Sequence, residues 1–216
     1  MQPIISVVGK SKSGKTTLLE SLTAELKQRG YRVAIIKHSG DDFELDTVSK
    51  DTWRFSQAGS EVSAINSAHN LAVFRQVERN LNPQELPRFI GWDYDLILTE
   101  GFKKANMPKI EVHRKEQGEG LLCPLPQLLA VVTDEPLDIA VPQFSKDEIK
   151  KIADLIEERI LTQSKEDDIE LLVNNERIPL TEFPKSTLVN TLLGMISALK
   201  GVKEVKTINI SLRRRT

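Results

Sequence analysis

The feature that most constrains the fold is an eight-residue run, Gly9 to Thr16 (GKSKSGKT), which matches the pattern G-x-x-x-x-G-K-[ST] in full. It follows a continuous apolar run, Pro3 to Gly9, with the composition of a strand buried on both faces. It precedes a segment from Lys15 to Arg29 whose leucines repeat at helical spacing, and Gly30 stands where the helix should end. Backbone amides in such a glycine-rich turn, together with the start of the helix, favour a bound phosphate chain.

The segments that follow predict a mostly parallel sheet. A strand from Arg32 to Lys37 completes a β-α-β unit, and later apolar strands are expected at 94–99, 109–113 and 128–133. Ser145 and Glu148 form a capping box that opens a helix. Shorter predicted elements are a helix at 51–58, a hairpin of 61–66 with 70–75, and a weak helix at 84–89. The fold class expected is therefore α/β, a P-loop NTPase with a twisted sheet flanked by helices.

The composition changes near Thr162, where a charged stretch without periodicity reads as a linker. After it, two short alternating runs flank Asn174-Asn175, which suits a tight hairpin turn. Pro184 then opens an apolar helix, and a last strand is expected at 208–212. We expect a nucleotide-binding domain at 1–163 and a small α+β (ββαβ) domain at 164–216, whose role the sequence leaves open.

Charge and cysteine content narrow the classes of partner. The net charge is −1 with 28% charged residues, so we expect neither a nucleic acid nor a membrane as a partner. The one cysteine, Cys123, allows no internal disulfide and has no neighbour at metal-binding spacing, so we expect it to be buried without a role. No apolar stretch is long enough to span a bilayer. The expected location is cytoplasmic.

The loop motif also predicts which residues bind. Lys15 should reach the β- and γ-phosphates, and Thr16 should offer its hydroxyl to Mg²⁺. Glu100 stands at the C-terminal end of a predicted strand, where ligands bind in open parallel sheets, so we assign it as the second metal-side group, which acts directly or through water. Lys12 could add positive charge at the mouth of the loop, and a solvated side chain explains this lysine equally well. The residues expected to hold the nucleotide are Gly9, Lys12, Ser13, Gly14, Lys15, Thr16 and Thr17.

Two aspartates complete the predicted site. Asp46 lies in the acidic loop after the second strand and is the acid that we expect to serve the metal or the attacking water, which makes Lys15, Asp46 and Glu100 the predicted catalytic residues. Asp134 follows a later strand, and an aspartate there can accept from both N1 and N2 of guanine. A turn-forming aspartate explains Asp134 as well, so both readings stand.

Several segments, taken in order, resemble the molybdopterin-guanine dinucleotide biosynthesis protein B (MobB) family. They lie between about residues 3 and 160, and they are GKSKSGKTTLLE, VAIIKHSGDDFELD, SKDTWRFSQAG, DLILTEGFK, MPKIEVHR and LLAVVTDEPLDI. Two positions depart from the family pattern: Ser-Gly-Asp replaces a histidine-rich turn after Lys37-His38, and Ser49 replaces a glycine. The segment from Ile169 onward is not part of that pattern.

The resemblance implies a homodimeric protein that binds GTP and Mg²⁺ and has low GTPase activity. It implies a role beside the MobA-type molybdopterin guanylyltransferase, which joins GMP to molybdopterin in molybdenum cofactor biosynthesis. Molybdopterin itself or a molybdoenzyme is a further partner that the resemblance leaves open. Lys103 would lie beside the cleft, and the hairpin at 61–75 would pair two copies, since exposed hairpin edges pair readily.

Two other function classes use the same phosphate loop. A small-molecule kinase would need an arginine-rich lid, and the segment between Thr99 and Thr133 offers only Arg114. A nucleotide-gated adaptor or metallochaperone would need a cluster of cysteine and histidine, whereas three histidines and one cysteine lie far apart in this sequence.

Overall fold

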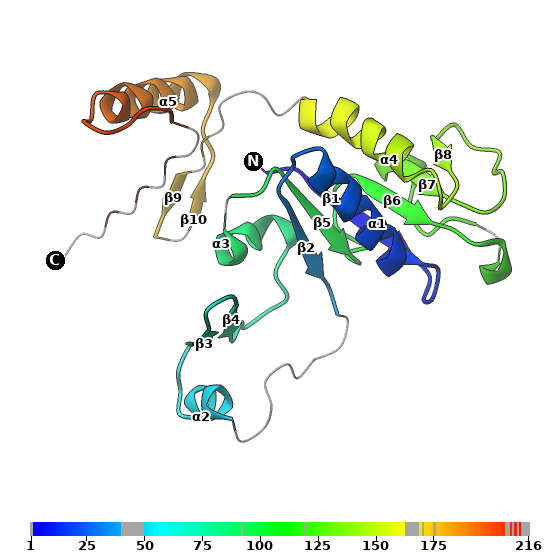
Figure 1. Ribbon diagram of the computed structural model, residues 1–216, viewed down its shortest axis with the longest axis horizontal. Helices are drawn as coiled ribbons and strands as arrows, with labels where there is room; N and C mark the ends of the chain where they lie inside the picture. Colours follow the sequence, from blue (N-terminus) through cyan, green and yellow to red (C-terminus); the bar gives the residue numbers. More distant parts are fainter. Residues whose placement is uncertain are drawn as a thin grey trace. The chain divides into compact units, whose positions relative to one another are not determined.

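The computed structural model describes residues 2–39, 50–91, 93–118, 120–162, 169, 171–174, 176–205, 208, 210 and 212, with the backbone alone at 176 and 177. The chain divides into two compact units, Gln2–Thr162 and Gln163–Thr216 (Figure 1).

The first unit is built on a sheet of six parallel strands in the order β2-β5-β1-β6-β7-β8 (Figure 1). The strands are β1 (Ile4–Gly9), β2 (Val33–Lys37), β5 (Leu96–Glu100), β6 (Lys109–Val112), β7 (Leu128–Val132) and β8 (Gln143–Phe144). The predicted α/β class with a P-loop arrangement is thus confirmed. β8 was not predicted, because a strand of two residues carries no periodic signal.

β1 owes its central place to its composition. All six of its residues are buried, as a strand covered on both faces requires. It pairs with β5 through Ile4↔Ile97 to Val7↔Glu100, and with β6 through Ser6↔Lys109 to Gly9↔Val112. The C-terminal ends of β1, β5 and β6 therefore meet at the same edge of the sheet.

The helices of this unit follow the predicted periodicity closely. They are α1 (Lys15–Gln28), α2 (Asp51–Gln57), α3 (Pro87–Ile90) and α4 (Ile149–Ile156), and α4 runs on into a π-helical turn at Glu157–Leu161. Single 3₁₀ turns occur at Pro83–Glu85, Lys115–Gln117 and Leu125–Gln127. The predicted start of α4 is wrong by three residues: Glu148 Oε2 accepts from the Ser145 backbone at 2.9 Å, but the helix begins only at Ile149.

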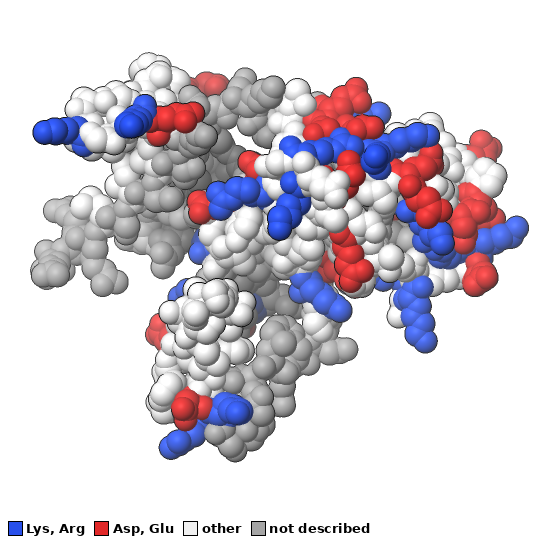
Figure 2. Space-filling model, in the orientation of Figure 1, with Lys and Arg blue, Asp and Glu red and all other residues white. Residues whose placement is uncertain are grey.

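α1 and α4 lie side by side on one face of the sheet and bury the main core there (Figure 1). Alternate residues of β1 divide between the faces: Ile5 and Val7 point to these helices, while Ile4 and Val8 belong to smaller apolar clusters. Arg29, the residue that follows α1, forms ion pairs with Glu25 of α1, Asp154 of α4 and Glu157 of the π-helical turn, and these pairs join the two helices. Acidic and basic side chains are interspersed over α1 and α4 (Figure 2).

The predicted hairpin at 61–75 is confirmed as two antiparallel strands, β3 (Val62–Asn66) and β4 (Leu71–Arg75), outside the main sheet. Several of its apolar side chains are exposed, among them Ile65, Leu71 and Val73. Pairing of this hairpin with a second copy stays a prediction.

The second unit contains a hairpin and a helix, in the predicted order. They are β9 (Leu171–Val173), β10 (Glu176–Ile178) and α5 (Glu182–Ser197). Asn174 has φ 53°, the left-handed conformation that a tight turn between strands favours for asparagine. α5 begins two residues before Pro184, which is tolerated within a first helical turn. The described residues of the predicted last strand, Ile208, Ile210 and Leu212, form no strand, and its other residues lie outside the description.

Candidate phosphate-binding site

The loop between β1 and α1 is held in a conformation that needs its two glycines. Gly14 is the N-cap of α1 with φ 97°, so it takes the left-handed conformation that other residues disfavour. At Gly9 a Cβ would lie 2.6 Å from the Val112 carbonyl oxygen and 2.6 Å from Ser13 Oγ. The loop is therefore packed against β6 so closely that only a glycine fits at its start.

Lys15 is the first residue of α1, and its side chain turns back over the loop. Its Nζ donates to the Lys10 carbonyl oxygen at 2.7 Å. Burial lowers the pKa of Lys15 below its ordinary value; the charge of Glu100 opposes this effect, and the charges of Lys103 and Lys37 add to it. Three lysines and one carboxylate thus share one electrostatic environment at the C-terminal edge of the sheet.

The two residues predicted to ligate a metal lie in direct contact. Thr16 Oγ1 donates to Glu100 Oε2 at 3.1 Å, although the residues are 84 positions apart. Glu100 ends β5, so its carboxylate is at the edge where the phosphate loop begins. Asp95, before β5, is at the other end of that strand, where its Oδ2 accepts from the Arg32 backbone at 2.7 Å.

The segment after β5 packs against the residue that follows β2. His38, which follows β2, donates its backbone N–H to the Glu100 carbonyl oxygen at 2.9 Å, and its ring stacks on Phe102 with centroids 4.3 Å apart. A Cβ on Gly101 would lie 3.2 Å from His38 Cβ. His38 therefore has a structural role, which brings Lys37 and Lys103 to the same edge as Lys15.

A second segment, which the sequence analysis did not assign to the site, lies on the loop. Gln117 Nε2 donates to the Ser11 carbonyl oxygen at 2.8 Å, and Lys10 Nζ donates to the Gln117 carbonyl oxygen. Nothing in the pattern around Gln117 signals these contacts, because they join residues more than a hundred positions apart in sequence. The loop is thus braced from the 3₁₀ turn that follows β6.

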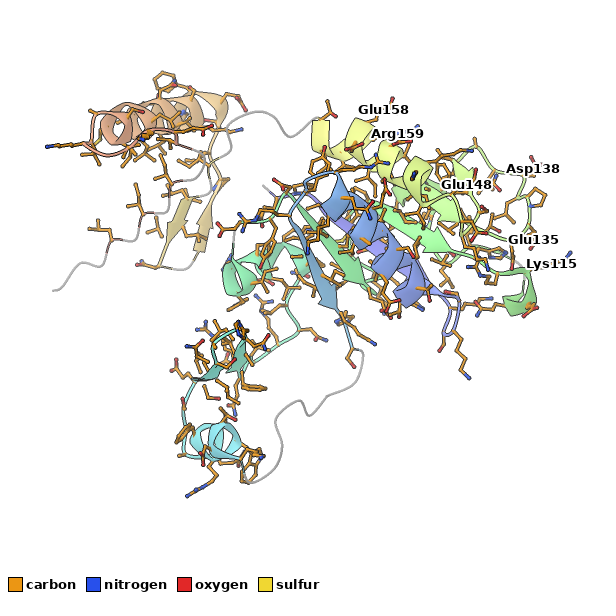
Figure 3. All side chains as sticks on the ribbon, in the orientation of Figure 1. Lys115, Glu135, Asp138, Glu148, Glu158 and Arg159 are labelled. Atoms are coloured by element: carbon orange, nitrogen blue, oxygen red, sulfur yellow. The ribbon has the colours of Figure 1, made fainter. Side chains whose placement is uncertain are left out.

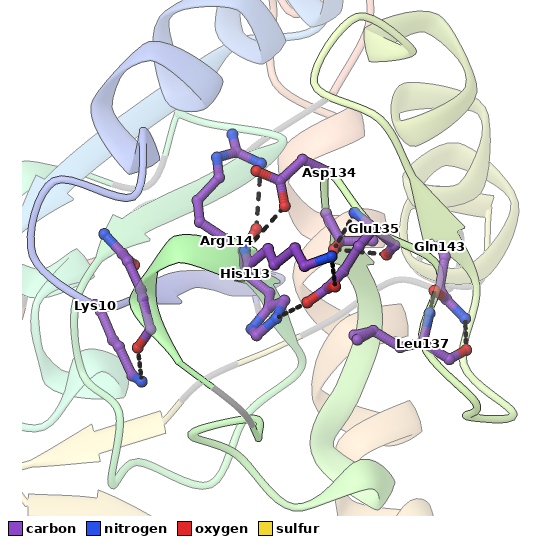
Figure 4. Close-up of polar contacts among 10 residues, drawn as sticks. Lys10, His113, Arg114, Asp134, Glu135, Leu137 and Gln143 are labelled. Carbon is purple, nitrogen blue, oxygen red and sulfur yellow. Dashed lines mark hydrogen bonds and ion pairs between the residues drawn. The ribbon is translucent and has the colours of Figure 1, made fainter.

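Asp134 braces the same 3₁₀ turn (Figure 4). Its Oδ1 accepts from the Lys115 backbone at 3.0 Å, and this bond is the main cause that lowers the pKa of Asp134. Beside it, Glu135 Oε1 lies 3.3 Å from His113 Nε2, and Glu135 Oε2 lies 3.7 Å from Lys115 Nζ (Figures 3 and 4). The Asp134 carboxylate thus bonds to a turn that is distant in sequence, and both readings of this residue, the local turn and the recognition of guanine, stay predictions.

The other predicted residues take varied positions. Lys12 and Thr17 are exposed, and Lys12 has φ 62°. Asp46 lies outside the described residues. Cys123 is buried, as expected. The backbone N–H groups of Leu122 and Cys123 donate hydrogen bonds to the Glu111 carboxylate. The part of the chain that the structure describes holds no cluster of three or more His, Cys, Asp or Glu suited to a metal, and no helix there could cross a membrane.

The loop residues fit a magnesium-bound phosphate chain. Ser13 is 1% exposed, and its Oγ has no hydrogen-bond partner among the described residues, as expected of a polar atom that faces a ligand. Thr16 and Glu100 offer a hydroxyl and a carboxylate oxygen, the hard oxygen ligands that Mg²⁺ prefers. The arrangement can bind a polyphosphate through backbone amides, Lys15 and a metal held at Thr16.

Comparison with known families agrees with this geometry. The family described as "Molybdopterin guanine dinucleotide synthesis protein B" (MobB) matches residues 4–134. The chain is 38% identical over 160 residues to a molybdopterin-guanine dinucleotide biosynthesis adapter protein from Haemophilus influenzae, covering 72% of this chain and 88% of that one. It is 32% identical over 170 residues to the protein of that name from Escherichia coli, with 76% and 97% covered.

Solved structures are similar as well. The crystal structure of Bacillus subtilis MobB matches with a TM-score of 0.58 and 30% identity over 76% of this chain and 99% of that chain. A MobB homologue from Bacillus stearothermophilus matches with a TM-score of 0.57 and 26% identity, covering 74% of this chain and 98% of that chain.

A relative by sequence from Methanocaldococcus jannaschii is 26% identical over 97% of both chains, so most of the second unit has a counterpart there.

Proposed function

This chain belongs to the molybdopterin guanine dinucleotide synthesis protein B (MobB) family, and we propose that it is a GTP-binding adapter with slow GTPase activity in molybdopterin-guanine dinucleotide biosynthesis. The observation that carries the proposal is the meeting of Lys15, Thr16 and Glu100 at one end of the phosphate loop.

In this proposal each residue has a separate task. Lys15 places an ammonium beside the β- and γ-phosphates, and the amides at the start of α1 bind the same oxygens. Thr16 and Glu100 hold Mg²⁺, directly or through water, in place of the hydrogen bond that now joins them. The ion, when bound, neutralises charge on the phosphates. Asp46 or another acid of its loop would position the attacking water.

The pathway role comes from the relatives, which are named as adapter proteins of molybdopterin-guanine dinucleotide biosynthesis. We therefore propose that the chain assists a MobA-type guanylyltransferase that joins GMP to molybdopterin. Pairing of two copies through β3 and β4 belongs to the same proposal, supported by the exposed apolar side chains of that hairpin.

The binding claim is tested by calorimetry of the intact protein with Mg·GTP and Mg·ATP. We expect Lys15→Ala to weaken Mg·GTP binding roughly 100-fold, because a charge-assisted contact to phosphate is lost in a partly dry site. Thr16→Ala should remove most of the dependence on Mg²⁺. Lys27→Ala, an exposed lysine in the last turn of α1, is the matched control and should bind as the unaltered protein does.

Phosphate release and partner capture test the rest. Slow release of phosphate from GTP alone supports a GTPase, whereas transfer that requires a second substrate supports a kinase. GTP-dependent capture of the guanylyltransferase supports the adapter role. If no nucleoside triphosphate binds in the presence of Mg²⁺, the proposal as a whole is contradicted.

A further inference from the structure

The segment 114–118, here called the brace, is fixed to the phosphate loop at its C-terminal side. Gln117 contributes both contacts: its side chain donates to the Ser11 carbonyl oxygen at 2.8 Å, and its backbone oxygen accepts from Lys10 Nζ. Gly118 lies close to the same lysine, since a Cβ there would be 3.7 Å from Lys10 Nζ. The brace is therefore hydrogen-bonded to the loop through Gln117.

The N-terminal side of the brace is fixed to the end of β7. The Lys115 backbone donates to Asp134 Oδ1 at 3.0 Å, and Lys115 Nζ lies 3.7 Å from Glu135 Oε2 (Figures 3 and 4). Arg114 joins this anchored segment to β6 and is half-buried. Its backbone is thus held from both sides, which limits where its side chain can reach.

The guanidinium of Arg114 lies at the start of α1. Its Nη2 is 3.4 Å from the position that a Cβ on Gly14 would occupy, and its Nη1 donates to the His113 carbonyl oxygen at 3.2 Å. Gly14 is the N-cap of α1, so the guanidinium stands beside the backbone amides that open the helix. The unpartnered Ser13 Oγ, 1% exposed, belongs to the same turn of the loop.

A cation at this place requires an explanation. The start of a helix carries partial positive charge, and Lys15 adds a full charge, so a further cation there is unfavourable unless an anion is bound. Arg114 forms no ion pair within the part of the chain that the structure describes, although its charge acts on Asp134 as a lesser influence. Arginine presents a fork of donors that matches two phosphate oxygens.

We propose that Arg114 binds the phosphate chain of the nucleotide, as a second cation beside Lys15 that the brace holds in place. This inference rests on the proposed function, since its ligand is the magnesium-bound triphosphate. Asp134 and Gln117 are then positioning residues: they fix the brace and touch no phosphate.

The test is calorimetry with two probes, Mg·GTP and magnesium tripolyphosphate, the latter having phosphates but no base or sugar. We expect Arg114→Ala to weaken both probes by about 10- to 100-fold, the loss of one or two charge-assisted hydrogen bonds. Arg114→Lys should recover part of the affinity, because it keeps the charge and loses the fork. Lys27→Ala, the exposed lysine in the last turn of α1, lies at the far end of that helix from the loop and should bind both probes unchanged.

The outcomes separate the possible failures. If the unaltered protein binds both probes and the Arg114→Ala variant binds each of them as tightly as the unaltered protein does, the inference is overturned while the proposed function stands. A loss confined to Mg·GTP also overturns it, because Arg114 would then contact the base or the sugar. If the unaltered protein binds neither probe, the proposed function itself fails. Should Arg114→Ala unfold, Arg114→Gln, which keeps the length of the side chain, is measured in its place.

Discussion

The proposed role of Glu100 depends on its place as the last residue of β5. Its Oε2 accepts from Thr16 at 3.1 Å, and its charge opposes the effect of burial on the pKa of Lys15. A shift of one residue in the register of β5 would turn the carboxylate to the other face of the sheet. The position of one carboxylate thus links the strand order to the phosphate loop.

Another carboxylate, Glu85, gives a prediction at the residue scale. Two bonds to Arg79, at 2.9 and 2.5 Å, and one from the Asn82 backbone lower the pKa of Glu85 to about 2, with Arg79 the larger cause. Because this pKa is lowered on folding, the stabilisation is complete above the ordinary value of 4.5 and is lost as the pH falls toward about 2. Arg79→Ala should raise the pKa, as an NMR titration of the Glu85 carboxyl carbon would show.

Arg79→Lys provides the control, since it keeps the charge but not the paired bonds. In this variant the pKa of Glu85 should lie between its values in the unaltered protein and in the Arg79→Ala variant. A Glu85 carboxyl that titrates identically in the Arg79→Ala variant would contradict the assigned cause.

Residues of the site differ in how far sequence could predict them. Lys15 and Thr16 follow from the loop motif, and Glu100 follows from its place at the end of an apolar run. Gln117 carries no such signal, and the sequence analysis weighed Arg114 only as a thin lid. Gln117 and Arg114 reach the loop because β6 pairs with β1. That pairing is a long-range contact, which no local sequence pattern encodes.

At the scale of elements, the approach of β6 to the phosphate loop gives a second prediction. Gly9→Ala would place a Cβ 2.6 Å from the Val112 carbonyl oxygen, so the loop and β6 must separate. We expect a loss of about 1–3 kcal/mol in the free energy of unfolding and at least about a tenfold loss of tripolyphosphate binding. Thermal unfolding and calorimetry measure the two effects.

Gly30→Ala is the matched control for this variant. Gly30 has φ 94°, and nothing lies within 4 Å of the Cβ that it would gain, so the substitution costs roughly 1–2 kcal/mol of backbone strain. It should bind tripolyphosphate normally. If the Gly9→Ala variant binds tripolyphosphate as tightly as the unaltered protein does, the close packing of the loop against β6 is contradicted.

Elements with strong periodicity were predicted well, and the others were not. The strands β1, β2, β5, β6 and β7 differ from the predicted ranges by one or two residues at an end. α4 starts late because Lys146 and Asp147 form a turn in place of helix, a local choice that the capping pattern does not decide. The strand order could not be derived, since it depends on which apolar runs pair across long loops.

For the whole molecule, the division into two units gives a third prediction. The main core, from Ile5 to Leu161, lies entirely within Gln2–Thr162. We therefore expect a chain of residues 1–162 to fold alone and to bind Mg·GTP within about twofold of the intact protein, because the phosphate loop, Glu100 and the brace all belong to this unit. Circular dichroism and calorimetry would check this. Loss of cooperative unfolding in the shortened chain would show that the second unit is needed for folding.

The position of β1 also determines when the protein can mature during its synthesis. β1 is the earliest strand made, yet its two neighbours come from residues 96–100 and 109–112. The apolar run IISVVG must therefore wait, unpaired, while about a hundred further residues emerge from the ribosome, a delay of roughly 5–20 s at ordinary rates of translation. Chaperones and early aggregation would act on this nascent segment until β5 and β6 have been made.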